Sequence, residues 1–104
     1  SEPFNASPVQ HLLQAGDAPA AIQRLDKWHA DSAPISESLY LLALSCRYAG
    51  DLKRALETIE ELHTLAPKFG RGFQEAGHIH VALPNQEQAL SAFQRAVALN
   101  DSLL

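Results

Sequence analysis

The sequence has 104 residues, a formal net charge of −4 and a single cysteine. A chain of this length forms one domain that buries about two thirds of the surface exposed by its unfolded form. The acidic balance argues against nucleic acid as the main partner, because phosphate binding needs a dense face of Lys and Arg. No apolar run approaches the roughly 20 residues that cross a bilayer. We therefore expect no membrane association and a cytoplasmic location, with the periplasm as the alternative.

Caps and helix breakers predict six helices in chain order. Ser7 as N-cap and Pro8 as first residue predict a helix that ends at Gly16. Asp17 predicts the cap of a second helix, which runs to about Ala30. Four more helices follow from the same signals. They begin near Ser36, after Asp51, near Phe69 and after Asn85, and they end at Gly50, before Pro67, before Pro84 and near Leu99.

The chain repeats itself with a period of 34 residues. Ala21, Ala55 and Ala89 mark the same position in three successive units. Each alanine is expected where the two helices of a unit cross closely, because a longer side chain would push their axes beyond the usual separation of about 8–10 Å. Large apolar residues recur in the same phase, as Ile22, Leu56 and Leu90 and as Leu25, Ile59 and Phe93. A period of this length with helical spacing inside each unit predicts a solenoid.

These residues resemble the tetratricopeptide repeat, a 34-residue helix-turn-helix unit, over nearly the whole chain. The third unit departs from the family at Pro84, where glycine is usual in the turn, and at Asp101, where proline usually follows. The resemblance is strongest in the second unit, at Leu39, Leu42, Ala43, Gly50, Ala55, Ile59, Leu62 and Pro67.

The resemblance implies an all-α, right-handed superhelical solenoid of three helix-turn-helix units. It would contain six helices and the start of a seventh. Residues 1–104 would form a single domain, with units at about residues 2–35, 36–69 and 70–103. We also expect the chain to be a fragment of a longer protein.

In this family the first helices of successive units line a concave groove that binds a peptide or partner segment. Tyr40, Leu44 and Tyr48 are spaced by four residues and form one stripe on the third helix. The alternative is that both tyrosines pack on a neighbouring helix with their hydroxyls in water. The groove positions carried over from the family are Gln10, Leu13, Gln14, Glu37, Tyr40, Leu44, Arg47, Tyr48, Arg71, Gln74, His78 and Val81.

One subclass of the family grips the terminal carboxylate of a peptide with lysines, asparagines and an arginine. Only Arg71 fits that pattern, so this ligand is not expected. The matching positions hold Ala6, Gln10, Leu41, Arg71 and Glu75.

The sequence predicts no catalytic residue, no cofactor and no metal site, and therefore no enzyme in this chain. His78 and His80 point about 200° apart on a helix, so they cannot share an ion. His80 and Cys46 fall in one core column. Glu57 and Glu61 are neighbours on a helix face expected to be solvated, where carboxylates are not desolvated for acid-base chemistry.

The C-terminal end of the array is predicted to be open. Natural arrays finish with a polar capping helix, whereas the sixth helix presents Leu90, Phe93 and Val97, and Leu103 and Leu104 read as the start of a seventh. An uncovered apolar patch marks an interaction site. We therefore expect either a continuing chain or a homodimer formed through this end.

Two classes of function remain open. One is a protein-interaction scaffold that binds a partner in the groove. The other is an accessory repeat domain of a larger enzyme, because residues 71–104 resemble repeats found ahead of bacterial sulfotransferase domains. Sequence downstream of residue 104 would separate the two.

Overall fold

The computed structural model describes residues 2–101, and within that range it contains six helices and no strand. The Cα radius of gyration is 13.5 Å, as expected of a compact domain of this size. No helix in residues 2–101 is long and apolar enough to cross a membrane. The helices are α1 (Ser7–Gln14), α2 (Ala18–His29), α3 (Ser36–Tyr48), α4 (Leu52–Leu65), α5 (Gly70–Ala82) and α6 (Gln86–Asp101).

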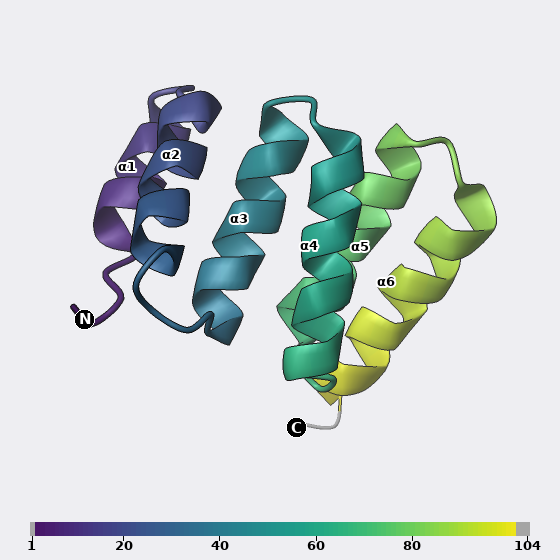
Figure 1. Cartoon of the computed structure of the whole chain (residues 1–104). Helices are drawn as coiled ribbons and strands as arrows, with labels where there is room; N and C mark the ends of the chain where they lie inside the picture. The colour runs from purple at the N-terminus through teal and green to yellow at the C-terminus, as the bar shows by residue number, and fades with distance from the viewer. Residues whose placement is uncertain (1, 102–104) are drawn as a thin grey trace.

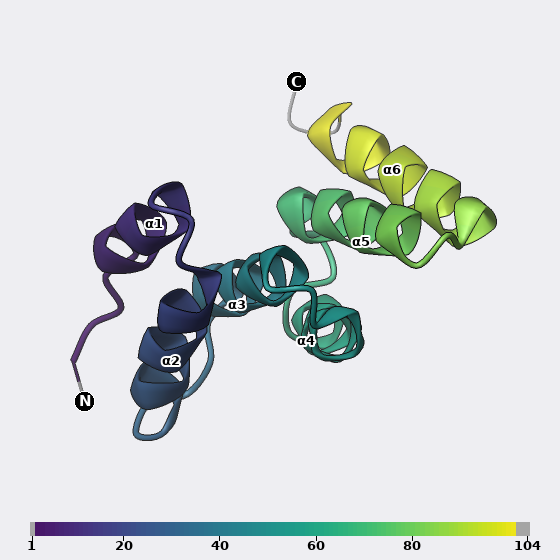
Figure 2. The same cartoon turned by 90° about the horizontal axis from the view of Figure 1, so that it is seen from above.

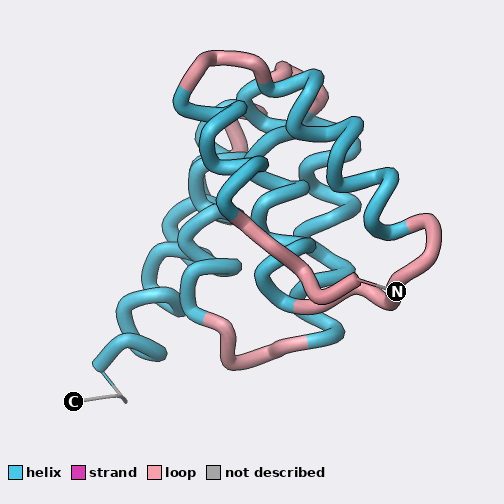
Figure 3. Tube along the Cα trace, turned by 90° about the vertical axis from the view of Figure 1, so that its left-hand side faces the viewer, coloured by secondary structure: helices cyan, strands magenta, loops and turns pink. Residues whose placement is uncertain are grey.

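The helices lie side by side in chain order, and short connections join them (Figure 1, Figure 3). Each helix packs against the next, and α3 also contacts α5 directly. Seen from above, α1, α3 and α5 form one row (Figure 2). Helices α2 and α4 lie on one side of that row, whereas α6 lies beyond α5 toward the other side. These neighbour contacts fit a helical repeat.

The predicted caps of α2 and α4 are confirmed. Asp17 accepts a hydrogen bond from the Ala20 amide and Asp51 accepts one from the Arg54 amide, both at 3.1 Å. The predicted cap of α1 is wrong by one residue. Ala6 holds the N-cap position without a side-chain bond, and Ser7 is the first helical residue.

Asn5 explains the different start of α1. Its Oδ1 accepts a hydrogen bond from the Ser7 amide at 3.2 Å, so a side chain two residues upstream satisfies a free helix N–H. At the other end of the chain, α6 continues through Asp101, two residues beyond the expected end near Leu99.

The turns between paired helices repeat with the same 34-residue interval as the sequence. In the first turn the Asp17 amide donates to the Leu12 carbonyl at 2.8 Å, and in the second the Asp51 amide donates to the Cys46 carbonyl at 2.9 Å. The glycine before each donor has positive φ, 80° at Gly16 and 82° at Gly50. This pairing of bonds and backbone is the Schellman helix ending, for which glycine is the favoured residue.

The third turn follows the same path with a proline in the glycine position. The Asn85 amide donates to the His80 carbonyl at 2.7 Å, which is the same bond to a carbonyl five residues earlier as in the other two turns. In those turns the glycine N–H makes a second bond, from Gly16 to the Leu13 carbonyl and from Gly50 to the Arg47 carbonyl, both at 3.0 Å. Pro84 has no N–H to donate, and its φ of 24° lies far from the value near −65° that its ring prefers. Proline in the glycine position therefore removes one hydrogen bond from this turn and introduces backbone strain.

The repeated alanines lie in the core, as the close-crossing interpretation predicts. Ala21 and Ala55 are fully buried and Ala89 is 5% exposed. Cys46 is buried as well, and burial raises the pKa of its thiol to about 11, so it remains a neutral packing group. His80 is half-buried, and its Nδ1 lies 3.3 Å from Nδ2 of the Asn85 side chain.

Candidate functional site: a groove across α1, α3 and α5

An open groove of about 770 Å³ crosses the row formed by α1, α3 and α5. Helix α1 contributes Gln10, Leu13 and Gln14, and the start of α5 contributes Arg71. Helix α3 supplies the largest share of the lining residues. Eight of the twelve predicted groove positions line the groove: Gln10, Leu13, Gln14, Glu37, Tyr40, Leu44, Tyr48 and Arg71.

Arg71 joins the α5 side of the groove to α3. Its Nη2 donates to Oε2 of Glu37 at 2.6 Å. Its guanidinium carbon also lies 4.9 Å from the ring centres of both Tyr40 and Phe69, within the range of a cation–π contact. The Arg71 side chain is 53% exposed, so this arrangement forms the surface of the groove rather than its core.

The two tyrosines have different surroundings. Tyr40 is half-buried, with its ring centre 6.0 Å from that of Phe69 in an edge-to-face arrangement. Burial is the main reason that the pKa of Tyr40 is raised, so its hydroxyl stays protonated near neutral pH. Tyr48, by contrast, is 60% exposed. Tyr40 therefore packs on a neighbouring residue, as the alternative interpretation expects, whereas the ring of Tyr48 is accessible to a ligand.

Arg47, a predicted groove contact, lies outside the groove lining and forms an ion pair. Its Nε and Nη2 donate to the two carboxylate oxygens of Glu75 at 2.5 and 3.0 Å. Glu75 is 2% exposed, so the pair joins α3 and α5 at a desolvated position. The hydrogen bond that Arg47 donates to Glu75 is the largest cause of the raised pKa of Arg47. Arg47 also lies over the Tyr48 ring, 4.8 Å from its centre, and thereby supports the exposed tyrosine.

The remaining predicted groove contacts lie outside the groove lining. Gln74 and His78 are exposed on α5. The His78 ring lies 5.2 Å from that of Phe93 in an edge-to-face arrangement, so it is directed toward α6. Val81 is 60% exposed on the same helix.

The residues of the predicted self-association end differ in their exposure to solvent. Leu90 and Val97 are 59% and 58% exposed on α6. Phe93 is half-buried, because its ring covers Gly77 of α5 so closely that a Cβ added there would lie 2.4 Å from a ring carbon. Leu103 and Leu104 lie outside the described residues.

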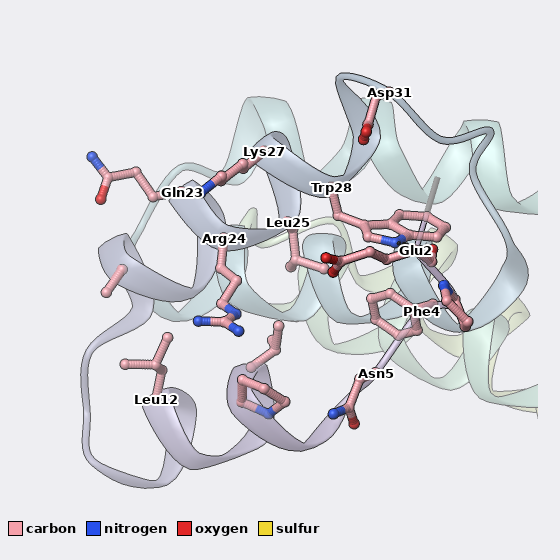
Figure 4. Close-up of a pocket in the computed structure, with 14 residues that line it drawn as sticks. Glu2, Phe4, Asn5, Leu12, Gln23, Arg24, Leu25, Lys27, Trp28 and Asp31 are labelled. Carbon is pink, nitrogen blue, oxygen red and sulfur yellow. Dashed lines mark hydrogen bonds between the residues drawn. The ribbon is translucent and has the colours of Figure 1, made fainter.

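Sequence reasoning missed a second cavity of about 890 Å³ at the N-terminal end. Residues 2–5 form part of its wall, and Phe4 packs edge-to-face on Trp28 with ring centres 5.0 Å apart (Figure 4). The indole N–H of Trp28 donates to the Glu2 carbonyl at 3.0 Å. Arg24 reaches into the space beside Leu12 (Figure 4). The one available signal was Phe4, an aromatic residue ahead of the first helix.

Comparison with known proteins does not assign this chain to a family. A search against protein families finds no match, and a search of curated proteins finds no significant relative.

Proposed function

We propose that this chain is a protein-interaction module of the tetratricopeptide type. In this proposal three helix pairs form a superhelical solenoid, and its concave groove binds an extended peptide or partner segment. Support for the family comes from the 34-residue period in the sequence and from the turns after α1, α3 and α5, whose hydrogen bonds recur at the same interval.

The observation that carries the binding proposal is the composition of the groove. Side chains that are more than fifty residues apart in the sequence, such as Gln14 and Arg71, line one open surface. That surface combines aromatic rings, amides and an ion pair. A few convergent polar groups beside apolar surface are typical of ligand sites, and tyrosine and arginine are enriched where partners bind.

The test is a selection from a displayed library of random peptides. Selected peptides are measured against the wild-type chain and against Tyr48→Ala, a change that removes an exposed ring and spares the core. We expect the variant to bind the selected peptides at least about tenfold more weakly, because exposed aromatic anchors dominate interface energies.

The matched control is Glu57→Ala, which changes an exposed residue on α4, outside the groove lining. It should bind as the wild type does, and both variants should keep the helical circular dichroism signal. Selected peptides that bind Tyr48→Ala as tightly as the wild type would move the binding surface away from the groove and contradict the proposal.

A further inference from the structure

The charges of the groove bear on the kind of partner that it accepts. Arg71 is bound to Glu37 at 2.6 Å, and Arg47 is bound to Glu75 through two hydrogen bonds. Each guanidinium is therefore already neutralised by a carboxylate. At Arg47 a ligand carboxylate would have to displace Glu75 and leave a buried charge unpaired, which is costly. At Arg71, which is 53% exposed, it would meet a guanidinium whose charge Glu37 already balances.

Apart from the Arg71–Glu37 pair, the side chains that line the groove are uncharged. Tyr48 exposes a large ring, and Tyr40 and Leu44 are half-buried beside it on α3. Gln10 and Gln14 are exposed on the facing wall, where each amide can donate and accept hydrogen bonds. This combination favours a ligand with flat apolar side chains and free backbone carbonyls.

The spacing of the stripe suits an extended chain. Tyr40 and Tyr48 are eight residues apart on a helix that rises about 1.5 Å per residue, so their Cα atoms are separated by about 12 Å along the axis. A polyproline II segment rises about 3.1 Å per residue, so about four of its residues span that distance. Such a segment has no internal hydrogen bonds, and its carbonyls are free to accept from amides.

From these observations we propose that the groove binds an uncharged, proline-rich segment in the polyproline II conformation. The inference rests on the proposed function, because it names the partner class of the same groove. Proline rings would pack on Tyr48 and Leu44, and the glutamine amides of α1 would donate to the carbonyls of the segment. The preformed conformation of proline-rich chains lowers the entropy lost on binding, as in other aromatic-lined grooves that take such ligands.

An amphipathic helix suits this groove less well. A helix binds by laying a continuous apolar face into an apolar groove. Here the walls on both sides of the apolar stripe are polar, with Gln10 and Gln14 on α1 and the pair of Glu37 and Arg71 on the other side. A bound helix would bury these polar groups and leave some of their hydrogen bonds unmade, which is costly.

The experiment compares four fluorescein-labelled peptides of equal length by fluorescence anisotropy. The probes are a repeating Pro-Pro-Leu peptide, a repeating Ala-Ala-Leu peptide, the Pro-Pro-Leu peptide with an acidic C-terminal tail, and an amphipathic helical peptide. We expect Pro-Pro-Leu to bind at least about tenfold more tightly than Ala-Ala-Leu. The acidic tail should bring no gain. Tyr48→Ala should weaken Pro-Pro-Leu binding by about tenfold, whereas Glu57→Ala should leave it unchanged.

Two results would overturn the inference in distinguishable ways. If the helical or acidic peptide binds more tightly than Pro-Pro-Leu and depends on Tyr48, the partner class is wrong and the groove function stands. If none of the four peptides binds in a Tyr48-dependent way, and the library yields no such peptide either, both the partner class and the proposed function fail.

Discussion

The second and third helix pairs follow one backbone plan with different side chains in the same places. Ala43 of α3 and Ile59 of α4 are both buried in the second pair. The equivalent residues 34 positions later are Gly77 of α5 and Phe93 of α6, whose ring fills the space above the glycine. A smaller residue on one helix is thus matched by a larger one on its partner, which keeps the volume between the helices filled.

The turns of the two pairs differ without such compensation. Gly50 adopts its φ of 82° at no steric cost, and its N–H donates to the Arg47 carbonyl at 3.0 Å. Pro84 has neither that freedom nor a donor. The repeat therefore tolerates exchanges of core residues when the total volume is kept. At the third turn nothing compensates for the strained φ and the missing N–H of Pro84.

The largest predicted effect concerns the ion pair that joins the two helix pairs. Arg47→Ala leaves the carboxylate of Glu75, which is 2% exposed, without its partner. We expect a loss of about 3 kcal/mol in the free energy of unfolding, measured by urea denaturation. The double variant Arg47→Ala/Glu75→Leu removes the stranded charge and should recover most of the loss. A single variant as stable as the wild type would show that the pair does not couple the units.

The next prediction tests whether volume is matched within each pair. Gly77→Ala places a Cβ 2.4–2.6 Å from three carbons of the Phe93 ring, so the ring must leave its place. We expect a net loss of about 2 kcal/mol, in spite of the better helix propensity of alanine. Gly77→Ala/Phe93→Ile copies the second pair and should be more stable than Gly77→Ala alone. Equal denaturation midpoints for these two variants would refute the volume matching.

A smaller effect, of opposite sign, is predicted at the third turn. Pro84→Gly restores the residue found at the other two turns, removes the strained φ and supplies the missing N–H donor. We expect a gain of about 1 kcal/mol, because the relief of strain exceeds the added flexibility of the unfolded chain. Thermal unfolding followed by circular dichroism measures this gain. A lower melting temperature would mean that proline fits this turn better than glycine does.

The smallest predicted effect is a dependence of stability on pH. His63 of α4 stacks on Phe73 of α5 with ring centres 3.9 Å apart, and burial lowers its pKa from the ordinary value of 6.5. The folded state therefore binds a proton less tightly than the unfolded state does. Stability should be complete above pH 6.5 and fall as the pH drops below that value.

The control for this prediction must account for His29, whose pKa burial also lowers. We expect His63→Gln to reduce the slope of unfolding free energy against pH below 6.5, and His63→Gln/His29→Gln to reduce it further. An unchanged slope in the double variant would assign the acid sensitivity to other groups.

Much of the architecture could be predicted because local signals determine it. Asp17 and Asp51 each cap a helix by accepting a hydrogen bond from the amide three residues later. Gly16 and Gly50 each end a helix by adopting a positive φ. The 34-residue period then indicated which apolar residues share the core. The prediction was wrong at Ser7 because two nearby polar residues could cap the helix. Asn5, and not Ser7, accepts the hydrogen bond from a free N–H at the start of α1.

The resemblance to the repeat family predicted part of the groove lining and none of its ion pairs. It placed Gln10, Tyr48 and Arg71 on one surface, whereas Arg47, Gln74, His78 and Val81 lie outside the lining. It could not predict that Arg47 binds Glu75, 28 residues away, because that pair depends on the rotation of α5 against α3. The same limit applies to Phe93, which the pattern placed at an open end and which instead covers Gly77.

The central claim is that the groove across α1, α3 and α5 is the binding surface. The most direct measurement is a titration of the ¹⁵N-labelled chain with the Pro-Pro-Leu peptide, followed by amide chemical shifts. The largest shifts should fall on the side-chain amides of Gln10 and Gln14 and on the backbone around Tyr48, with little change around Glu57 on α4. Shifts confined to α2, α4 or the outer face of α6 would contradict the account.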